Sequence, residues 1–314
     1  MSLFQRRNLG VALALLSVAA ALPTFEDFRK ADRARRDAQQ WQSETAARLT
    51  QPDLSLVRKA AAKHRADWEL QWGAAELLSA WEEKRACFEV ALKQSGTNVA
   101  VALRFGCALA CEEKPEPALQ WLAYCQRHDK SNAVPYLAEL WVLRKMGDED
   151  RFEPTGAGPL FRDYAEQAAR ARIRLLEAAG YSKYAARRIG FLPSLYAVRM
   201  AQDLRKGSHA AYVEQFLLDT AKAMQTAATY LVTELAGESL ETTMLERQKD
   251  SPLKETRLEE LERRRASLGE LVREMDQRVE LATEARMVQY FDELLLLGEI
   301  EAMKRLGRDV GKPR

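Results

Sequence analysis

The chain has 314 residues, which is enough for one or two domains. Hydrophobic residues make up 47% of it and charged residues 30%, as in an ordinary soluble globular protein. The net charge of +2 excludes a protein that binds polyanions over its whole surface. Prolines and glycines lie almost entirely at segment ends, and runs of alternating β-branched residues are missing. The sequence therefore predicts an all-α fold.

The N-terminal stretch has the layout of a targeting segment. Arg6 and Arg7 precede an apolar run over residues 9–22, which ends in small residues. This run is shorter than the roughly 20 residues needed to span a bilayer, which favours cleavage. Residues 1–25 are predicted to form a signal peptide or an uncleaved signal-anchor. Either form implies an exported protein, periplasmic or anchored to the inner membrane.

Residues 26–52 are rich in interleaved charges and predict a solvated helical stalk. Its arginines and lysines would also contact anionic lipid if the anchor is retained. Asp53 is then expected to cap a helix over residues 54–62.

A 34-residue period runs through the next stretch. The positions that match at this spacing are Trp68, Ala102 and Tyr136; Trp72, Gly106 and Leu140; Lys84 and Ala118; Phe88 and Leu122; and Ala91 and Cys125. Together with the run Ala91–Asn98, this pattern resembles tetratricopeptide repeats over residues 53–150. Lys84 departs from the small residue expected there, and Gly96 and Lys130 replace the usual closing proline.

The resemblance implies stacked pairs of antiparallel helices in a protein that binds another protein. Gly106 would let the first helix of a pair lie against Ala118 on the second, and Phe88 and Leu122 would fill the seam between pairs. The alternative is an ordinary helical bundle with coincidental spacing.

In such a stack, the first helices of the pairs line a concave face. The resemblance therefore implies a protein-binding groove formed by Leu103, Cys107, Leu137, Trp141, Arg144 and Lys145. An apolar groove with an aromatic and a basic rim suits an amphipathic helix or an extended peptide. The alternative is that later helices of the same chain cover this face.

Four cysteines fall within the repeats: Cys87, Cys107, Cys111 and Cys125. In an oxidising compartment they would allow two disulfides in three connectivities. Small buried thiols are the favoured interpretation, and the spacing does not match a zinc site.

Residues 151–159 contain two prolines and two glycines and predict a loop between the repeats and a C-terminal helical domain over residues 151–314. Helices are expected over residues 160–179, 182–188 and 193–206. Basic residues on these helices could bind an anion or membrane lipid: Arg170, Arg174, Lys183, Arg187 and Arg188. The favoured alternative is a solvated surface, and no nucleic acid is expected for an exported protein.

A hydrophobic helix is expected over residues 208–236, ended by Gly237. A last long helix of about 30 residues should begin near Ser251, with apolar residues at heptad spacing. These are Leu258, Leu261, Leu268, Val272, Met275, Val279 and Ala282. The helix either forms a coiled coil in a homodimer or packs as an antiparallel hairpin on residues 208–248. Residues 290–297 are almost wholly apolar and should be buried.

The sequence shows no catalytic, metal-binding or cofactor motif. His64, His128 and His209 are scattered along the chain. The predicted function is a non-enzymatic protein-binding scaffold at the bacterial cell envelope. One alternative is a structural or oligomerising envelope protein that acts through its C-terminal helix. The other is an envelope hydrolase or lyase, which a cluster of acidic residues in a cleft would indicate.

Overall fold

The computed structural model describes residues 51–154, 158–227 and 229–310. Every regular element in these residues is helical, apart from one isolated β-bridge between Asn132 and Leu160, so the all-α prediction is confirmed. The predicted signal segment, residues 1–25, and almost all of the stalk lie outside the described residues. Within the described ranges, no helix is both long and apolar enough to cross a membrane.

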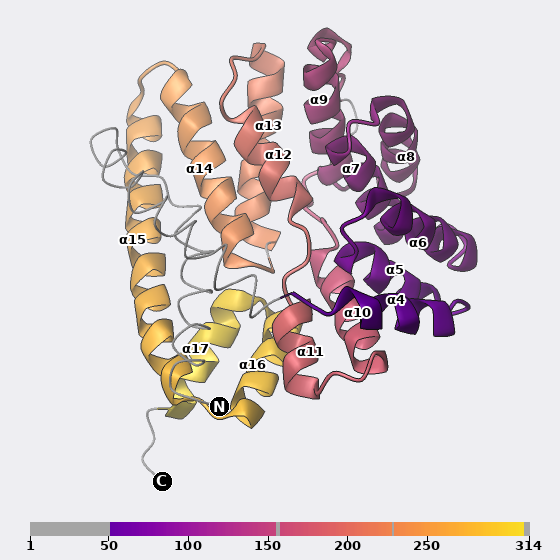
Figure 1. Cartoon of the computed structure of the whole chain (residues 1–314). Coiled ribbons are helices and arrows are strands. Elements are labelled where there is room, and N and C mark those ends of the chain that lie inside the picture. The colour runs from indigo at the N-terminus through magenta and orange to yellow at the C-terminus, as the bar shows by residue number, and fades with distance from the viewer. Residues whose placement is uncertain (1–50, 155–157, 228, 311–314) are drawn as a thin grey trace.

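The first half of the structure consists of packed helical hairpins (Figure 1). Helices α5 and α6 form one hairpin and α7 and α8 the next, with α4 before them and α9 after them. Their bounds are α4 (Leu54–Lys63), α5 (Trp68–Leu77), α6 (Trp81–Gln94), α7 (Val99–Cys111), α8 (Pro115–His128) and α9 (Val134–Met146). The predicted cap of α4 is confirmed, because a carboxylate oxygen of Asp53 accepts a hydrogen bond from Ser55 N at 2.8 Å.

Burial within the hairpins follows the 34-residue period at several positions. Phe88 and Leu122 are both fully buried, and so is Leu140. A Cβ atom at Gly106 would lie 3.3 Å from Trp121 Cβ, so α7 approaches α8 at this residue rather than at Ala118. Trp68 is only half-buried. The architecture is compatible with a stack of helical repeats.

The predicted loop after α9 folds back along the protein. It contains a short 3-10 helix, η2 (Glu149–Arg151), and its later part is held by the fully buried Asn132. Asn132 Oδ1 accepts a hydrogen bond from Arg162 N at 3.0 Å, and its Nδ2 donates one to Arg162 O at 2.8 Å. These bonds keep the chain extended around Arg162, which is why the next helix begins at Ala165 and not at residue 160.

The second half continues with eight helices within the described residues. Their bounds are α10 (Ala165–Ala178), α11 (Lys183–Gly190), α12 (Tyr196–Leu204), α13 (Ala211–Ala227), α14 (Leu231–Arg247), α15 (Pro252–Leu281), α16 (Glu284–Leu297) and α17 (Glu299–Val310). Helices α13, α14 and α15 lie side by side on one side of the molecule (Figure 1). Helix α10 returns to pack on α5, and α12 packs on α7 and α9. Both hydrophobic clusters therefore combine residues from before and after residue 150.

The single helix predicted over residues 208–236 is wrong, because α13 ends at Ala227 and α14 begins at Leu231. The break is held by Glu299 of α17, whose carboxylate accepts a hydrogen bond from Leu231 N at 2.7 Å. Gly237 does not end a helix but lies inside α14. A Cβ atom there would be 2.8 Å from Ala221 O, so the glycine allows α13 and α14 to pack closely.

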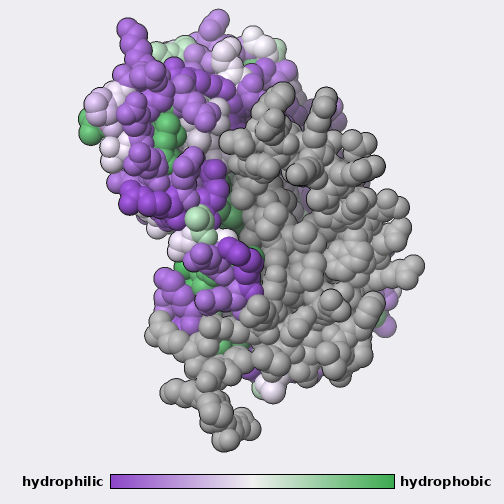
Figure 2. Space-filling view, turned by 90° about the vertical axis from the view of Figure 1, so that its left-hand side faces the viewer, coloured by the Kyte–Doolittle hydropathy of each residue, from purple (hydrophilic) through white to green (hydrophobic). Residues whose placement is uncertain are grey.

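The long C-terminal helix is present as α15, and Ser251 Oγ accepts a hydrogen bond from Lys254 N at 3.2 Å at its start. It packs on α14 and α17 of the same chain, which agrees with the hairpin alternative. The buried apolar residues on its inner side are Leu261, Leu268, Val272 and Met275. Figure 2 shows the side of the molecule on which α15 lies, and its visible described surface is mostly hydrophilic.

The apolar stretch over residues 290–297 belongs to α16. Tyr290, Phe291, Leu294 and Leu295 are buried, as expected, but Leu296 is 74% exposed.

Candidate functional site: the inner face of the helical hairpins and its surroundings

The predicted groove is filled by the chain itself. Leu103 and Cys107 on α7, and Leu137 and Trp141 on α9, are each no more than 2% exposed. Helix α12 lies against both of these helices, and Trp141 Nε1 donates a hydrogen bond to Asp203 Oδ2 at 3.2 Å. These four residues therefore line no open groove, and the alternative of an internally covered face is the correct one.

The covering helix has the pattern of a groove ligand. Helix α12 buries residues one or three positions apart along one side, Tyr196, Ala197, Met200, Ala201 and Leu204, and Val198 is buried as well. This is the stripe of an amphipathic helix, the ligand type that the groove was predicted to bind. Helix α10 covers α5 in the same way. There a Cβ atom at Gly73 would lie 2.3 Å from Ala171 O, so the glycine lets the two backbones approach closely.

The two basic residues of the predicted groove lie at the end of α9. Arg144 Nη1 is 3.1 Å from the imidazole nitrogens of His209 and 3.6 Å from a carboxylate oxygen of Glu149. The exposed Lys145 places its Nζ 4.0 Å from the ring centroid of Trp141. Both side chains are thus at the surface, but both also contact their own chain.

A buried ion pair joins the first two hairpins beneath α12. Arg104 of α7 makes two hydrogen bonds to the Glu76 carboxylate of α5, at 2.8 Å and 2.7 Å. Burial opposes ionisation of Glu76, but the charge and hydrogen bonds of Arg104 outweigh it and keep the pKa of Glu76 below its usual value. The guanidinium lies 4.6 Å from the ring centroid of Tyr196. This pair was missed in the sequence, although Arg104 is the one charged residue of α7.

Most of the predicted basic patch makes intramolecular contacts. The patch comprises Arg170, Arg174, Lys183, Arg187 and Arg188. Arg187 pairs with Glu177 at 2.7 Å and with Asp292 of α16 at 2.6 Å. The Arg188 guanidinium lies 5.7 Å from the ring centroid of Tyr184.

Two further members of the patch also join separate elements. Arg170 Nη2 donates a hydrogen bond to Leu295 O at 2.6 Å, and Arg174 pairs with Asp67 at 3.3 Å. Lys183 is exposed. The sequence could not show the partners of these arginines, because the partners lie far away along the chain.

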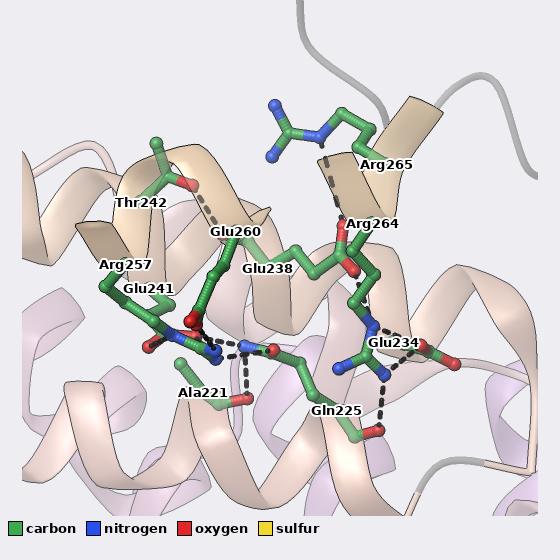
Figure 3. Close-up of polar contacts among 10 residues, drawn as sticks. All are labelled: Ala221, Gln225, Glu234, Glu238, Glu241, Thr242, Arg257, Glu260, Arg264 and Arg265. Atoms are coloured by element: carbon green, nitrogen blue, oxygen red, sulfur yellow. Dashed lines mark hydrogen bonds and ion pairs between the residues drawn. The ribbon is translucent and has the colours of Figure 1, made fainter. Parts of the chain in front are cut away.

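A row of buried glutamates faces arginines across α14 and α15 (Figure 3). At one end, Arg257 Nε and Nη2 lie 2.8 Å and 2.9 Å from the two carboxylate oxygens of Glu241. Gln225 of α13 donates a third hydrogen bond to this carboxylate at 2.6 Å. Burial opposes ionisation of Glu241, but Arg257 and Gln225 outweigh it and lower its pKa.

Glu238 lies in the middle of the row and has weaker partners. Arg264 Nε is 3.1 Å and Arg265 Nε 3.9 Å from its carboxylate, and neither oxygen makes a hydrogen bond within the described residues. Burial raises its pKa to about 7, against the attraction of the two arginines. At the other end of the row, Arg264 also contacts Glu234.

We call this set of contacts the charged seam: Glu234, Glu238 and Glu241 with Arg257, Arg264 and Arg265. The enzyme alternative asked for a cluster of acidic residues in a cleft, and these three glutamates are such a cluster of acidic residues. However, each carboxylate faces an arginine and lies beneath α15, so the arrangement joins two helices. No group of three or more potential metal ligands occurs in the part of the chain that the structure describes.

Aromatic rings form a row across α6, α7 and α8. Ring centroids are 6.4 Å apart between Trp81 and Phe105, 5.8 Å between Phe105 and Trp121, and 6.0 Å between Trp121 and Tyr124. His128 continues the row, 4.2 Å from Tyr124. Phe105 is buried, whereas Trp81, Trp121 and Tyr124 are half-buried. The 34-residue period did not reveal this row, because its aromatic residues are not among the positions that match at this spacing.

All four cysteines are unpaired in the structure; Cys107 and Cys125 are buried, as the buried-thiol interpretation expects, whereas Cys87 and Cys111 are half-buried. Burial raises the pKa of Cys87 to about 11 and that of Cys125 to about 12, so both remain protonated at neutral pH.

No protein family, curated protein or solved structure matches this chain.

Proposed function

We propose that this chain is a non-enzymatic scaffold of the bacterial cell envelope that binds a partner protein through its helical hairpins. The 34-residue period and the packed hairpins support a tetratricopeptide-like stack. The charged start and short apolar core of residues 1–25 support export or anchoring.

The aromatic row is the observation that carries this proposal. The inner face is occupied by α12, so a partner needs another surface. Trp81, Trp121 and Tyr124 are half-buried side chains held in place by ring contacts, and tryptophan and tyrosine are enriched among residues that dominate binding energy at protein interfaces. The half-buried members of the row belong to α6 and α8, and these two helices lie away from α15 (Figure 1).

The row also retains hydrogen-bonding capacity. Neither Trp81 nor Trp121 donates a hydrogen bond through its indole nitrogen to the described part of the chain. A tryptophan at an interface usually buries its ring and donates to the partner. The partner we propose therefore presents an apolar segment with backbone carbonyls near it.

The test is affinity capture from solubilised membranes with the full chain, followed by measurement of the captured partner. Trp81→Ser with Trp121→Ser should reduce capture at least about tenfold, the effect of losing one strong interface residue. The matched control is Trp68→Ser, which alters another half-buried tryptophan, one that stacks on Trp72 outside the row. Circular dichroism should show that the double variant keeps its helical content. Equal capture by the folded double variant and the wild type would contradict the proposal.

A structural or oligomerising role is the second candidate, favoured by the occupied inner face and by Leu253 of α15, which is 84% exposed. Sedimentation equilibrium decides between the two. This candidate predicts a dimer that Leu253→Glu dissociates, whereas the aromatic-row proposal predicts that this variant keeps its partner.

A further inference from the structure

The loops at one edge of the helical hairpins carry an excess of positive charge. They join α4 to α5, α6 to α7 and α8 to α9. Hydrogen bonds tie them together, because Gln94 Nε2 donates to Arg65 O at 2.7 Å and Tyr124 Oη on α8 donates to Thr97 O at 2.9 Å. We call the exposed cations in or next to these loops the basic edge: Lys63, Arg65, Lys93, Arg127 and Lys130.

The basic edge is not neutralised by the described part of the chain. None of its cations makes an ion pair with the described residues. The two carboxylates in the same loops have other partners, because Asp67 pairs with Arg174 at 3.3 Å and Asp129 pairs with Arg162 at 2.7 Å. A group of unpaired cations attracts anionic groups within about 10 Å at 0.1 M ionic strength.

The opposite edge of the hairpins has no such excess. Lys84 near the start of α6 and Glu112 after α7 line the same pocket, so these two ends are neighbours. The exposed charged residues in the first turns of α6 and α8 and in the loop between α7 and α8 are mostly acidic: Glu82, Glu112, Glu113, Glu116 and Lys114. Within the hairpins, the excess of positive charge therefore lies on one edge, unlike the mixed charges of an ordinary solvated surface.

The aromatic row ends at the basic edge. His128, its last ring, lies 4.2 Å from Tyr124 and directly follows Arg127 at the end of α8. An apolar segment that follows the row therefore has one end next to exposed cations. A bilayer fits this surface less well, because proteins that bind its surface insert exposed apolar side chains, whereas Trp121 and Tyr124 are held half-buried.

We propose, as an inference that rests on the proposed function, that the partner segment on the aromatic row carries acidic residues at one end and that these lie on the basic edge. The segment then lies in one direction along the row, because only one edge complements its charge. Exposed ion pairs add little to affinity, but they speed association and fix orientation, and salt screens them. The apolar contacts with the row should persist at high salt.

The test is fluorescence anisotropy of the full chain with three labelled probe peptides. Each has the same leucine-rich helical segment, followed by three glutamates, three glutamines or three lysines. At low salt, the glutamate peptide should bind about tenfold more tightly than the glutamine peptide, as for three exposed ion pairs, and the lysine peptide should bind most weakly. At high salt, the three affinities should converge.

Reversing three charges of the basic edge together should remove the preference for the glutamate peptide: Lys93→Glu, Arg127→Glu and Lys130→Glu. The matched control reverses three exposed cations of α13 and α15: Lys222→Glu, Arg263→Glu and Arg273→Glu. It should keep the wild-type preference. Both variants change the net charge equally, so only the position of the charges differs. Melting temperatures measured without peptide should show that both are folded.

Trp81→Ser with Trp121→Ser separates this inference from the proposed function, and it should weaken binding of all three peptides. Unchanged binding in this variant would contradict the proposed function. Weakened binding there, with no effect of the basic-edge reversal, would contradict the inference alone. Phosphatidylglycerol vesicles provide the membrane alternative: the inference is wrong if they bind the wild type but not the basic-edge variant while the three peptides bind alike. No saturable binding of the glutamate peptide would contradict both proposals.

Discussion

Helices α12 and α15 both pack back on earlier parts of the chain, but through different interactions. Helix α12 covers the inner face of the hairpins with apolar side chains, and its Met200 and Leu204 are fully buried. Helix α15 also buries apolar residues, Leu261, Leu268, Val272 and Met275, but part of its contact with α14 is the charged seam, in which the arginine side chains are 25–41% exposed.

This difference implies unequal attachment. Burial of apolar area stabilises a contact irrespective of salt, whereas ion pairs with half-exposed arginines are screened by salt and contribute less. The inner face with α12 is therefore part of the core, and we expect α15 to open before α12. A partner that needed the inner face would have to unfold the core, which is why we propose the aromatic row as the binding surface.

The largest effect on stability is expected at the buried ion pair of Arg104 and Glu76 beneath α12. Arg104→Met should lower the free energy of unfolding by about 3–5 kcal/mol, because it leaves the buried Glu76 carboxylate without its cation. Urea denaturation measures this. Adding Glu76→Leu should restore much of the loss, since neither charge of the pair then remains. A loss below about 1 kcal/mol, the range of exposed pairs, would show that the inner face is not sealed.

A smaller loss is expected at the charged seam. Arg257→Met should cost about 1–2 kcal/mol, because Glu241 is buried but keeps its hydrogen bond from Gln225. Urea denaturation at low and high salt should give a smaller cost at high salt. Arg263→Met, also on α15 but exposed, serves as control and should change stability by less than about 0.5 kcal/mol. If Arg257→Met proved as costly as Arg104→Met, the two contacts would not differ as we infer.

The smallest effect is a pH dependence. Burial raises the pKa of both Glu238 and Glu299 to about 7. A group whose pKa is higher in the folded state contributes stability that is full below its unfolded pKa, near 4.5, and is lost as pH rises through about 7. Unfolding free energy should therefore decrease between pH 5 and 8.

Glu238→Gln should flatten this decrease by on the order of 1 kcal/mol, since the group no longer titrates. Thermal or urea unfolding at several pH values measures it, and the exposed Glu259→Gln should keep the wild-type profile. A profile of Glu238→Gln that is as steep as that of the wild type would assign the pH dependence to other groups.

Local signals in the sequence predicted much of the fold. Asp53 and Ser251 were identified as caps because capping depends on residues a few positions apart, and the buried Phe88 and Leu122 followed from a fixed spacing. The break before α14 was not predictable, because Glu299 from α17 holds it and no glycine or proline marks it.

The candidate sites depended more on distant contacts. The groove was predicted to be apolar apart from its basic rim, but apolar residues such as Leu103 and Leu137 suit a core as well as a binding surface. Only the packing of α12 on Trp141 decides between them. In the same way, the sequence gives no partner for Arg187, and only the fold brings Asp292 next to it.

Hydrogen exchange of the whole chain, measured by mass spectrometry, tests most directly whether α15 opens more easily than α12. The amides of α12 should exchange only through global unfolding. Added salt should therefore change their exchange rate only as far as it changes the stability of the whole protein. Those of α15 should exchange faster, through local opening that added salt accelerates. Exchange in α12 as fast as in α15, or protection of α15 that salt leaves unchanged, would contradict the account.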